Sequence, residues 1–263
     1  MTFPHPVFFI ALFCLLLASP CRAARSAEGP EKPQLVGKKV HLNDDEQEKL
    51  RRWKAGETVS PQAVRRYGEW RCFSADTISN AVFARMWGKS YKKGCSIPRS
   101  KLRYVKVLHI NGAGEIQLGE LVCHADIAAD LVSIFRDLYR ASYPIARMVL
   151  VDEYRADDET SMRANNTSCF CYRTVAGSRK VSAHAMGMAV DINPLYNPYV
   201  KRRANGRLFI QPANAEPYTH RERRFDYKIE RGDLCHRLFL QHGFSWGGAW
   251  RSLKDYQHFE KPF

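Results

Sequence analysis

Two short stretches of sequence, residues 182–194 and 250–260, constrain the fold of this chain more than any other feature. The first contains His184 and Asp191, and the second contains His258. Imidazole and carboxylate groups are ligands that Zn²⁺ accepts, and three protein ligands leave a fourth position open for water, as in catalytic zinc sites. A chain that uses these residues together must fold so that two stretches far apart in the sequence meet.

The local sequence favours such a meeting. Gly187 allows a sharp turn after His184 and a close approach of the backbone. The chain then enters a predicted strand, in which the period of two residues directs Asp191 to one face. In the last strand the same alternation places His258 on the face opposite Phe259, which we expect in the core.

The charges of these groups also suit hydrolysis. A zinc ion with two neutral imidazoles and one carboxylate keeps a charge of about +1, which lowers the pKa of bound water from roughly 15.7 toward about 7. Asp255, three residues before His258, can accept the proton as the water attacks a carbonyl. Spacing alone is weak support, because a histidine followed seven positions later by an aspartate often occurs by chance.

The two motifs together resemble a known family. The matching pattern is Ser182-x-His184-x-x-Gly187-x-Ala189-x-Asp191 with Asp255-x-x-His258-Phe259-Glu260. It is similar to the signature of the D-alanyl-D-alanine carboxypeptidase and L-alanyl-D-glutamate endopeptidase family (LAS-type, VanY-like), whose fold is shared with the Hedgehog amino-terminal domain. The resemblance covers roughly residues 120–263 and implies an α+β fold, a small antiparallel sheet with flanking helices.

The resemblance implies a role for each matching residue. His184, Asp191 and His258 would bind one Zn²⁺ per chain, and Asp255 would be the general base. Glu260 is then a partner of a ligand rather than the base. Many carboxypeptidases of the family carry Glu at the base position, and the Asp found here is more typical of the endopeptidase branch.

Other residues are expected to meet the substrate. The resemblance implies that Arg155, in the Tyr-Arg of the preceding loop, polarises the substrate carbonyl or holds its carboxylate, with Arg163 as the alternative. Ser182 either lies behind the ligands or caps a turn. Trp250 is assigned to substrate binding, although Trp250 and Trp246 are each also compatible with the core.

The resemblance predicts an exported zinc metallopeptidase that acts on peptidoglycan stem peptides as a monomer. The leading cleavage is at L-Ala-D-Glu, and D-Ala-D-Ala carboxypeptidase activity is a close second. The alternative from another class is a non-catalytic wall-binding module that retains the fold and the metal.

Periodicity predicts the secondary structure, whereas composition and the resemblance divide the chain into three segments. Helices are expected over 42–53, 75–87, 125–140 and 232–242, strands over 102–110, 115–122, 147–151, 188–192 and 256–260, and long loops over 153–180 and 193–230. Residues 1–23 are expected to be a signal peptide, 24–120 an N-terminal extension with helices and a hairpin, partly packed on the catalytic domain, and 121–263 the zinc peptidase domain.

The first residues suggest export. Val7 to Ala18 is almost entirely apolar and small residues follow at Ala23 and Ala24, as in a secretory signal. The run is too short to cross a bilayer comfortably, which takes roughly 20 apolar residues. A retained anchor and lipid attachment at Cys21 are the alternatives. After cleavage we expect no stable membrane span and a periplasmic, extracellular or cell-wall location.

Charge and cysteine content complete the expectations. The 41 basic residues exceed the 27 acidic ones, which favours anionic surfaces, or simply a solvated basic surface. No nucleic-acid-binding module is recognised, so nucleic acid is not an expected partner. Six cysteines follow the signal: Cys72, Cys95, Cys123, Cys169, Cys171 and Cys235. In an exported chain they predict up to three disulfides, with Cys72–Cys95 as a plausible local pair among 15 possible pairings.

Overall fold

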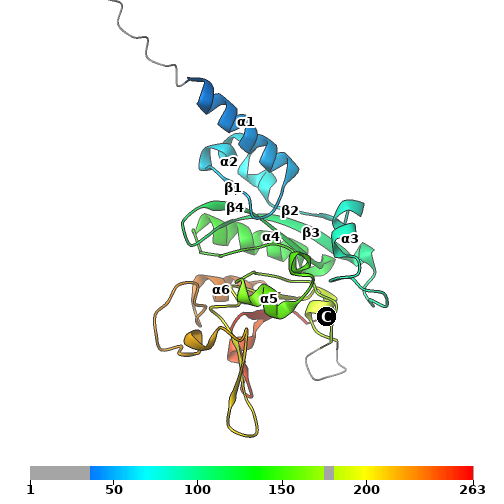
Figure 1. The fold of residues 1–263 in the computed structure, drawn as a ribbon, viewed down its shortest axis with the longest axis vertical. Helices are drawn as coiled ribbons and strands as arrows, with labels where there is room; N and C mark the ends of the chain where they lie inside the picture. Colours follow the sequence, from blue (N-terminus) through cyan, green and yellow to red (C-terminus); the bar gives the residue numbers. More distant parts are fainter. Residues whose placement is uncertain (1–35, 175–180, 263) are drawn as a thin grey trace, which may run out of the picture.

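The fold is α+β, as expected, with small antiparallel sheets and flanking helices (Figure 1). The computed structural model describes residues 36–174 and 181–262, so the expected signal peptide lies outside the described residues. Within those ranges the strands form a four-stranded sheet in the order β1-β4-β3-β2 and two three-stranded sheets, β5-β10-β8 and β7-β6-β9. None of the described helices is both long and apolar enough to cross a membrane.

The N-terminal part consists of two helices beside the edge of the first sheet (Figure 1). The expected first helix is present as α1 (Val36–Arg52), and β1 (Thr58–Val59) pairs with β4. In α2 (Pro61–Tyr67) the hydroxyl of Ser60 accepts a hydrogen bond from the backbone N–H of Ala63, and proline occupies the first turn, where its missing N–H costs nothing.

The predicted hairpin forms the centre of the first sheet. β3 (Leu102–Ile110) and β4 (Ile116–His124) pair along their full lengths, and the Asn111 side-chain oxygen accepts hydrogen bonds from backbone N–H groups of the connecting turn. The helix predicted over 75–87 is wrong in its first part. Residues Ser74–Thr77 pair with β3 as strand β2, and Ser79 caps the shorter helix α3 (Asn80–Met86).

The helix predicted over 125–140 is confirmed as α4 (Ala125–Arg140), which packs on β3 (Figure 1). Its buried residues are Ile127, Ala128, Leu131, Ile134, Phe135 and Leu138. They join a core cluster that extends from Leu50 to Phe259. One core therefore draws side chains from both sides of residue 120, which itself lies within β4.

Residues 147–151, predicted as a strand, form no ladder of their own and are instead hydrogen-bonded by the side chain of Asn166. Asn166 accepts a hydrogen bond from the backbone N–H of Val149 (2.9 Å) and donates one to its carbonyl (3.0 Å), as a neighbouring strand would do. The loop expected over 153–180 also contains a short helix, α5 (Asp158–Arg163), whose first turn Asp157 caps.

The loop expected over 193–230 is wrong as well, because it contains the hairpin of β6 (Tyr199–Arg202) and β7 (Leu208–Gln211). Its strands are short and their burial does not alternate, so they lack the apolar alternation that predicts a strand. Asn205-Gly206 at the turn was the available signal, since this dipeptide favours tight hairpin turns. The remaining elements are η1 (Glu69–Cys72), η2 (Arg99–Lys101), η3 (Val151–Tyr154), η4 (His184–Met186), β5 (Ala189–Asp191), η5 (Glu216–Thr219), α6 (Leu234–Gln241), β8 (Ser245–Trp246), η6 (Gly247–Ala249), β9 (Lys254–Asp255) and β10 (His258–Glu260).

The disulfides expected from the cysteine count are not formed. All six cysteines of the described chain are free, and five of them are buried. Cys72 belongs to the main core cluster, whereas Cys95 packs against a second cluster that includes Met86 and Leu102, so the expected local pair is not brought together.

Acid is expected to destabilise the fold through His109. Its ring is buried, Nδ1 donates a hydrogen bond to the carbonyl of Ile145 (2.8 Å), and burial lowers its pKa to about 4. The unfolded chain, with a pKa near 6.5, binds the proton first as the pH falls. Denaturant unfolding should therefore show a loss of about 2 kcal/mol between pH 7 and pH 5. His109→Gln cannot titrate, so its free energy of unfolding should change less between pH 7 and pH 5. The same pH dependence in wild type and variant would show that His109 is not the cause.

Candidate metal centre

A tight turn positions His184 at the first corner of the site. The hydroxyl of Ser182 accepts a hydrogen bond from the backbone N–H of His184 (3.2 Å), so Ser182 caps the turn, the alternative weighed for it above. Gly187 ends η4 at a φ of +69°, and a Cβ there would lie 2.7 Å from the backbone nitrogen of His124. Because of this contact and this φ, glycine is required for the chain to enter β5 here.

Strand pairing brings the other two residues together. β5 and β10 are antiparallel neighbours in which His258 lies opposite Asp191. Phe259 points the other way, is fully buried and stacks on Phe239 at 4.3 Å between ring centroids. The predicted alternation in the last strand is thus confirmed.

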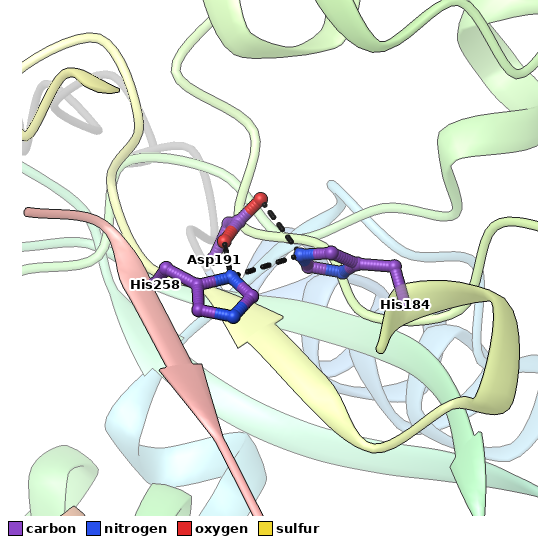
Figure 2. Close-up of side chains that lie close together, drawn as sticks. All are labelled: His184, Asp191 and His258. Atoms are coloured by element: carbon purple, nitrogen blue, oxygen red, sulfur yellow. Dashed lines mark hydrogen bonds and ion pairs between the residues drawn. The ribbon is translucent and has the colours of Figure 1, made fainter. Parts of the chain in front are cut away.

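The three side chains converge on one point (Figure 2). His184 Nε2 lies 3.2 Å from His258 Nδ1 and 3.2 Å from one Asp191 oxygen, and His258 Nδ1 lies 3.1 Å from the other oxygen. All three residues are buried. In a tetrahedral zinc site with bonds of about 2.0–2.1 Å, two ligand atoms lie about 3.3 Å apart. The observed separations fit such an ion.

Hydrogen bonds at the far sides of the rings fix which nitrogens face this point. His184 Nδ1 donates to the carbonyl of Cys169 (2.7 Å), and His258 Nε2 lies 3.3 Å from Glu260 Oε2. In neutral imidazoles the two facing nitrogens therefore carry lone pairs and no proton. Two lone pairs and the Asp191 carboxylate, gathered in a buried place, form a donor set that a cation between them would satisfy.

The pKa shifts of Asp191 and His258 also favour a positive charge at this point. Burial alone would raise the pKa of Asp191, but the adjacent His184 and His258 hold it well below its usual range. Burial alone would lower the pKa of His258, but hydrogen bonds with Asp191 and Glu260 raise it to about 10. The cluster therefore attracts positive charge strongly, which a divalent cation can supply in place of protons.

Asp255 lies beside the cluster but outside it. A Cβ on Gly247 would lie 2.6 Å from the Asp255 carbonyl oxygen and 2.8 Å from its Cβ, so the glycine leaves room for this residue. The Asp255 Oδ1 atom is inaccessible to solvent and has no hydrogen-bond partner among the described residues. Burial raises the pKa of Asp255 to about 7, against the lowering effect of the charge on His258. An unpartnered carboxylate oxygen with such a pKa suits a proton acceptor.

The cluster opens into a cleft of about 990 Å³. Trp250 lines this cleft, with its ring 5.4 Å from that of His258, whereas Trp246 is buried and stacks on Phe259. The structure thus separates the two tryptophans that the sequence leaves equivalent. The role of Trp250 in substrate binding stays a prediction.

The arginines of the preceding loop are placed differently from the expectation. Arg155 is exposed at the end of η3, Arg163 pairs with Glu159 (3.3 Å), and neither lines the cleft. Arg173, which the sequence analysis did not single out, lines the cleft and pairs with Asp158. The only feature of the sequence that could have indicated Arg173 is its position in the same long polar loop before His184.

A buried His-Asp-His cluster, an adjacent carboxylate and an open cleft make up the arrangement that metal-dependent hydrolases use. Residues 176–261, which contain both motifs, match the family model described as D-alanyl-D-alanine carboxypeptidase. This match agrees with the resemblance drawn from the motifs and supports a peptidase assignment for residues 176–261. No curated protein and no solved structure matches the chain.

Proposed function

We propose that this chain is an exported zinc metallopeptidase that hydrolyses peptidoglycan stem peptides. The observation that carries the proposal is the convergence of the His184, Asp191 and His258 ligand atoms beside the Asp255 oxygen that has no partner among the described residues, at the wall of a cleft. The matched family supports the substrate class. We propose cleavage at L-Ala-D-Glu first and at D-Ala-D-Ala second, because the shorter aspartate at the base position is more typical of the endopeptidase branch.

In this mechanism His184, Asp191 and His258 hold the metal ion, and Asp255 moves the proton. When bound, the ion polarises the peptide carbonyl and lowers the pKa of water. Asp255 accepts the proton of the attacking water and returns it to the leaving amine. Glu260 keeps the His258 ring oriented through its contact with Nε2.

Arg173 is proposed for the role that the resemblance gave to Arg155. Arg173 lines the cleft, and its guanidinium is paired with Asp158, a carboxyl whose pKa burial raises and the charge of Arg173 lowers. A guanidinium held in this way can donate to the developing oxyanion or to a substrate carboxylate. Arg155 and Arg163 stay predictions for the same role.

The experiment that tests the function is digestion of purified stem peptides, with the products identified by mass spectrometry. The enzyme should cleave them as purified, lose activity after treatment with a chelator, and regain it with one equivalent of Zn²⁺. The mass of the fragments gives the bond. A chain that binds Zn²⁺ and stem peptides but leaves every peptide intact would instead be the wall-binding module considered above.

A further inference from the structure

The β6–β7 hairpin has two different faces, and one of them lines the cleft. It projects from the lower end of the molecule and is drawn in yellow in Figure 1. The residues that line the cleft alternate along its strands: Tyr199, Lys201, Arg203, Phe209 and Gln211. Their intervening neighbours Val200, Arg202, Leu208 and Ile210 do not line it. A period of two residues is the pattern of one face of a strand pair, so one whole face of the hairpin forms a wall of the cleft.

The hairpin is joined directly to the strand that carries the general base. β6 pairs with β9 so that Tyr199 lies opposite Asp255. At about 3.3 Å per residue, Lys201 then lies about 7 Å along the strand from the level of the base, and Arg203 about 13 Å. A peptide bound in the extended form advances by a similar distance per residue. In an extended substrate that runs along β6, Lys201 and Arg203 would therefore lie beside the residues about two and about four positions from the bond that is cleaved.

The positive charges of Lys201 and Arg203 are not neutralised by carboxylates of the described chain. Among the described residues, Lys201 and Arg203 form no ion pair with a carboxylate, and both are exposed. The guanidinium of Arg203 lies over the ring of Phe209 at 4.7 Å from its centroid. The ring contacts Tyr199 edge-on at 6.1 Å. Stacking orients the arginine while its N–H groups keep their capacity to bind an anion.

We infer that the cleft face of the β6–β7 hairpin is an anion-binding subsite in which Lys201 and Arg203 bind the free carboxylates of an acidic peptide substrate. The inference rests on the proposed function, and it adds to that function a preference for peptides whose carboxylates are not amidated. The hairpin lies in line with the base and within the cleft, which favours a segment of the substrate itself over a separate polymer on the outer surface.

The test compares two variants that remove the same charge, one on the cleft face of the hairpin and one away from the cleft. Lys201→Gln/Arg203→Gln alters the cleft face. Arg202→Gln/Arg224→Gln alters two exposed residues that do not line the cleft. The substrates are a synthetic peptide with free carboxylates on the residues two and four positions from the L-Ala-D-Glu bond, and the same peptide with these carboxylates amidated. The cleft-face variant should raise KM for the acidic peptide on the order of tenfold with kcat nearly unchanged, because a charge-assisted hydrogen bond is lost. It should have little further effect on the amidated peptide, and the control variant should resemble wild type on both.

The subsite is excluded if the cleft-face variant behaves like the control variant, or if it loses the same factor on both peptides. Failure of the proposed function gives a different result, since wild type would then cleave neither peptide. In that case fluorescence anisotropy with the labelled acidic peptide still decides the subsite. Wild type should bind the acidic peptide on the order of tenfold more tightly than the cleft-face variant, and equal binding would overturn the inference.

Discussion

Asparagine in place of Asp255 is expected to lower kcat by roughly 10²- to 10⁴-fold while the chain still binds one Zn²⁺. Asn has nearly the same shape, so the fit beside Gly247 is kept, but its amide cannot accept the proton of the attacking water. Asp255 lies outside the His184, Asp191 and His258 cluster, and its removal therefore leaves the ligands intact. Steady-state cleavage of a stem peptide, together with zinc content measured by mass spectrometry, gives both quantities.

Glu260→Gln is the matched control, because it removes a carboxylate near the same cluster without removing the base. Glu260 faces His258 Nε2, so its loss should weaken metal binding by about 10- to 100-fold, and excess Zn²⁺ should restore activity. If Glu260→Gln at saturating Zn²⁺ lost as much activity as Asp255→Asn, the two roles would have to be exchanged.

The pH dependence of kcat/KM gives a second test that distinguishes the role of Asp255 from that of the metal ligands. Asp255 accepts a proton only in its ionised form, so kcat/KM should fall as the pH falls through its pKa, which burial raises to about 7. A bound divalent cation lowers this pKa, and the acidic limb of the profile is therefore expected at or below pH 7. Asp255→Asn should lose this limb from its residual activity.

The sequence identifies the His184, Asp191 and His258 cluster because much of its geometry is local. Gly187, the strand alternation around Asp191, and the opposition of His258 to Phe259 all follow from backbone geometry within a few residues. What joins them is the pairing of β5 with β10, a long-range contact that no local pattern specifies. Here the family resemblance supplied only the expectation that the two stretches meet, and the pairing of β5 with β10 brings them together.

The substrate side of the cleft is less accessible to sequence reasoning. Which of Arg155, Arg163 and Arg173 lines the cleft depends on α5 and on caps such as Asp157, which determine the course of the loop. The polar sequence of the loop does not predict this course. The sequence reasoning missed the hairpin for a related reason, since its strands are only four residues long and their burial does not alternate. Strands of this kind lack the period-two pattern by which strands are recognised.

Arg85→Ala is expected to lower the free energy of unfolding by about 3 to 5 kcal/mol, because it leaves a buried carboxylate without its charged partner. Glu120 on β4 is almost inaccessible to solvent, and Arg85 on α3 donates a hydrogen bond to it (2.8 Å). The Tyr104 hydroxyl (2.6 Å) also donates to Glu120, but it carries no compensating charge. Denaturant titration measures the loss. Arg85→Ala/Glu120→Gln should recover part of it, since the uncompensated charge is then gone.

This ion pair bears on the purpose of the N-terminal part. Arg85 also pairs with Glu153 (2.9 Å), a residue of η3 at the start of the loop that leads to Arg173 and His184. The extension is thereby tied to the segment that forms one wall of the cleft. We therefore expect Arg85→Ala to raise KM for the stem peptide under conditions where the variant is still folded. A variant that is destabilised but keeps the wild-type KM would show that the contact supports the fold alone.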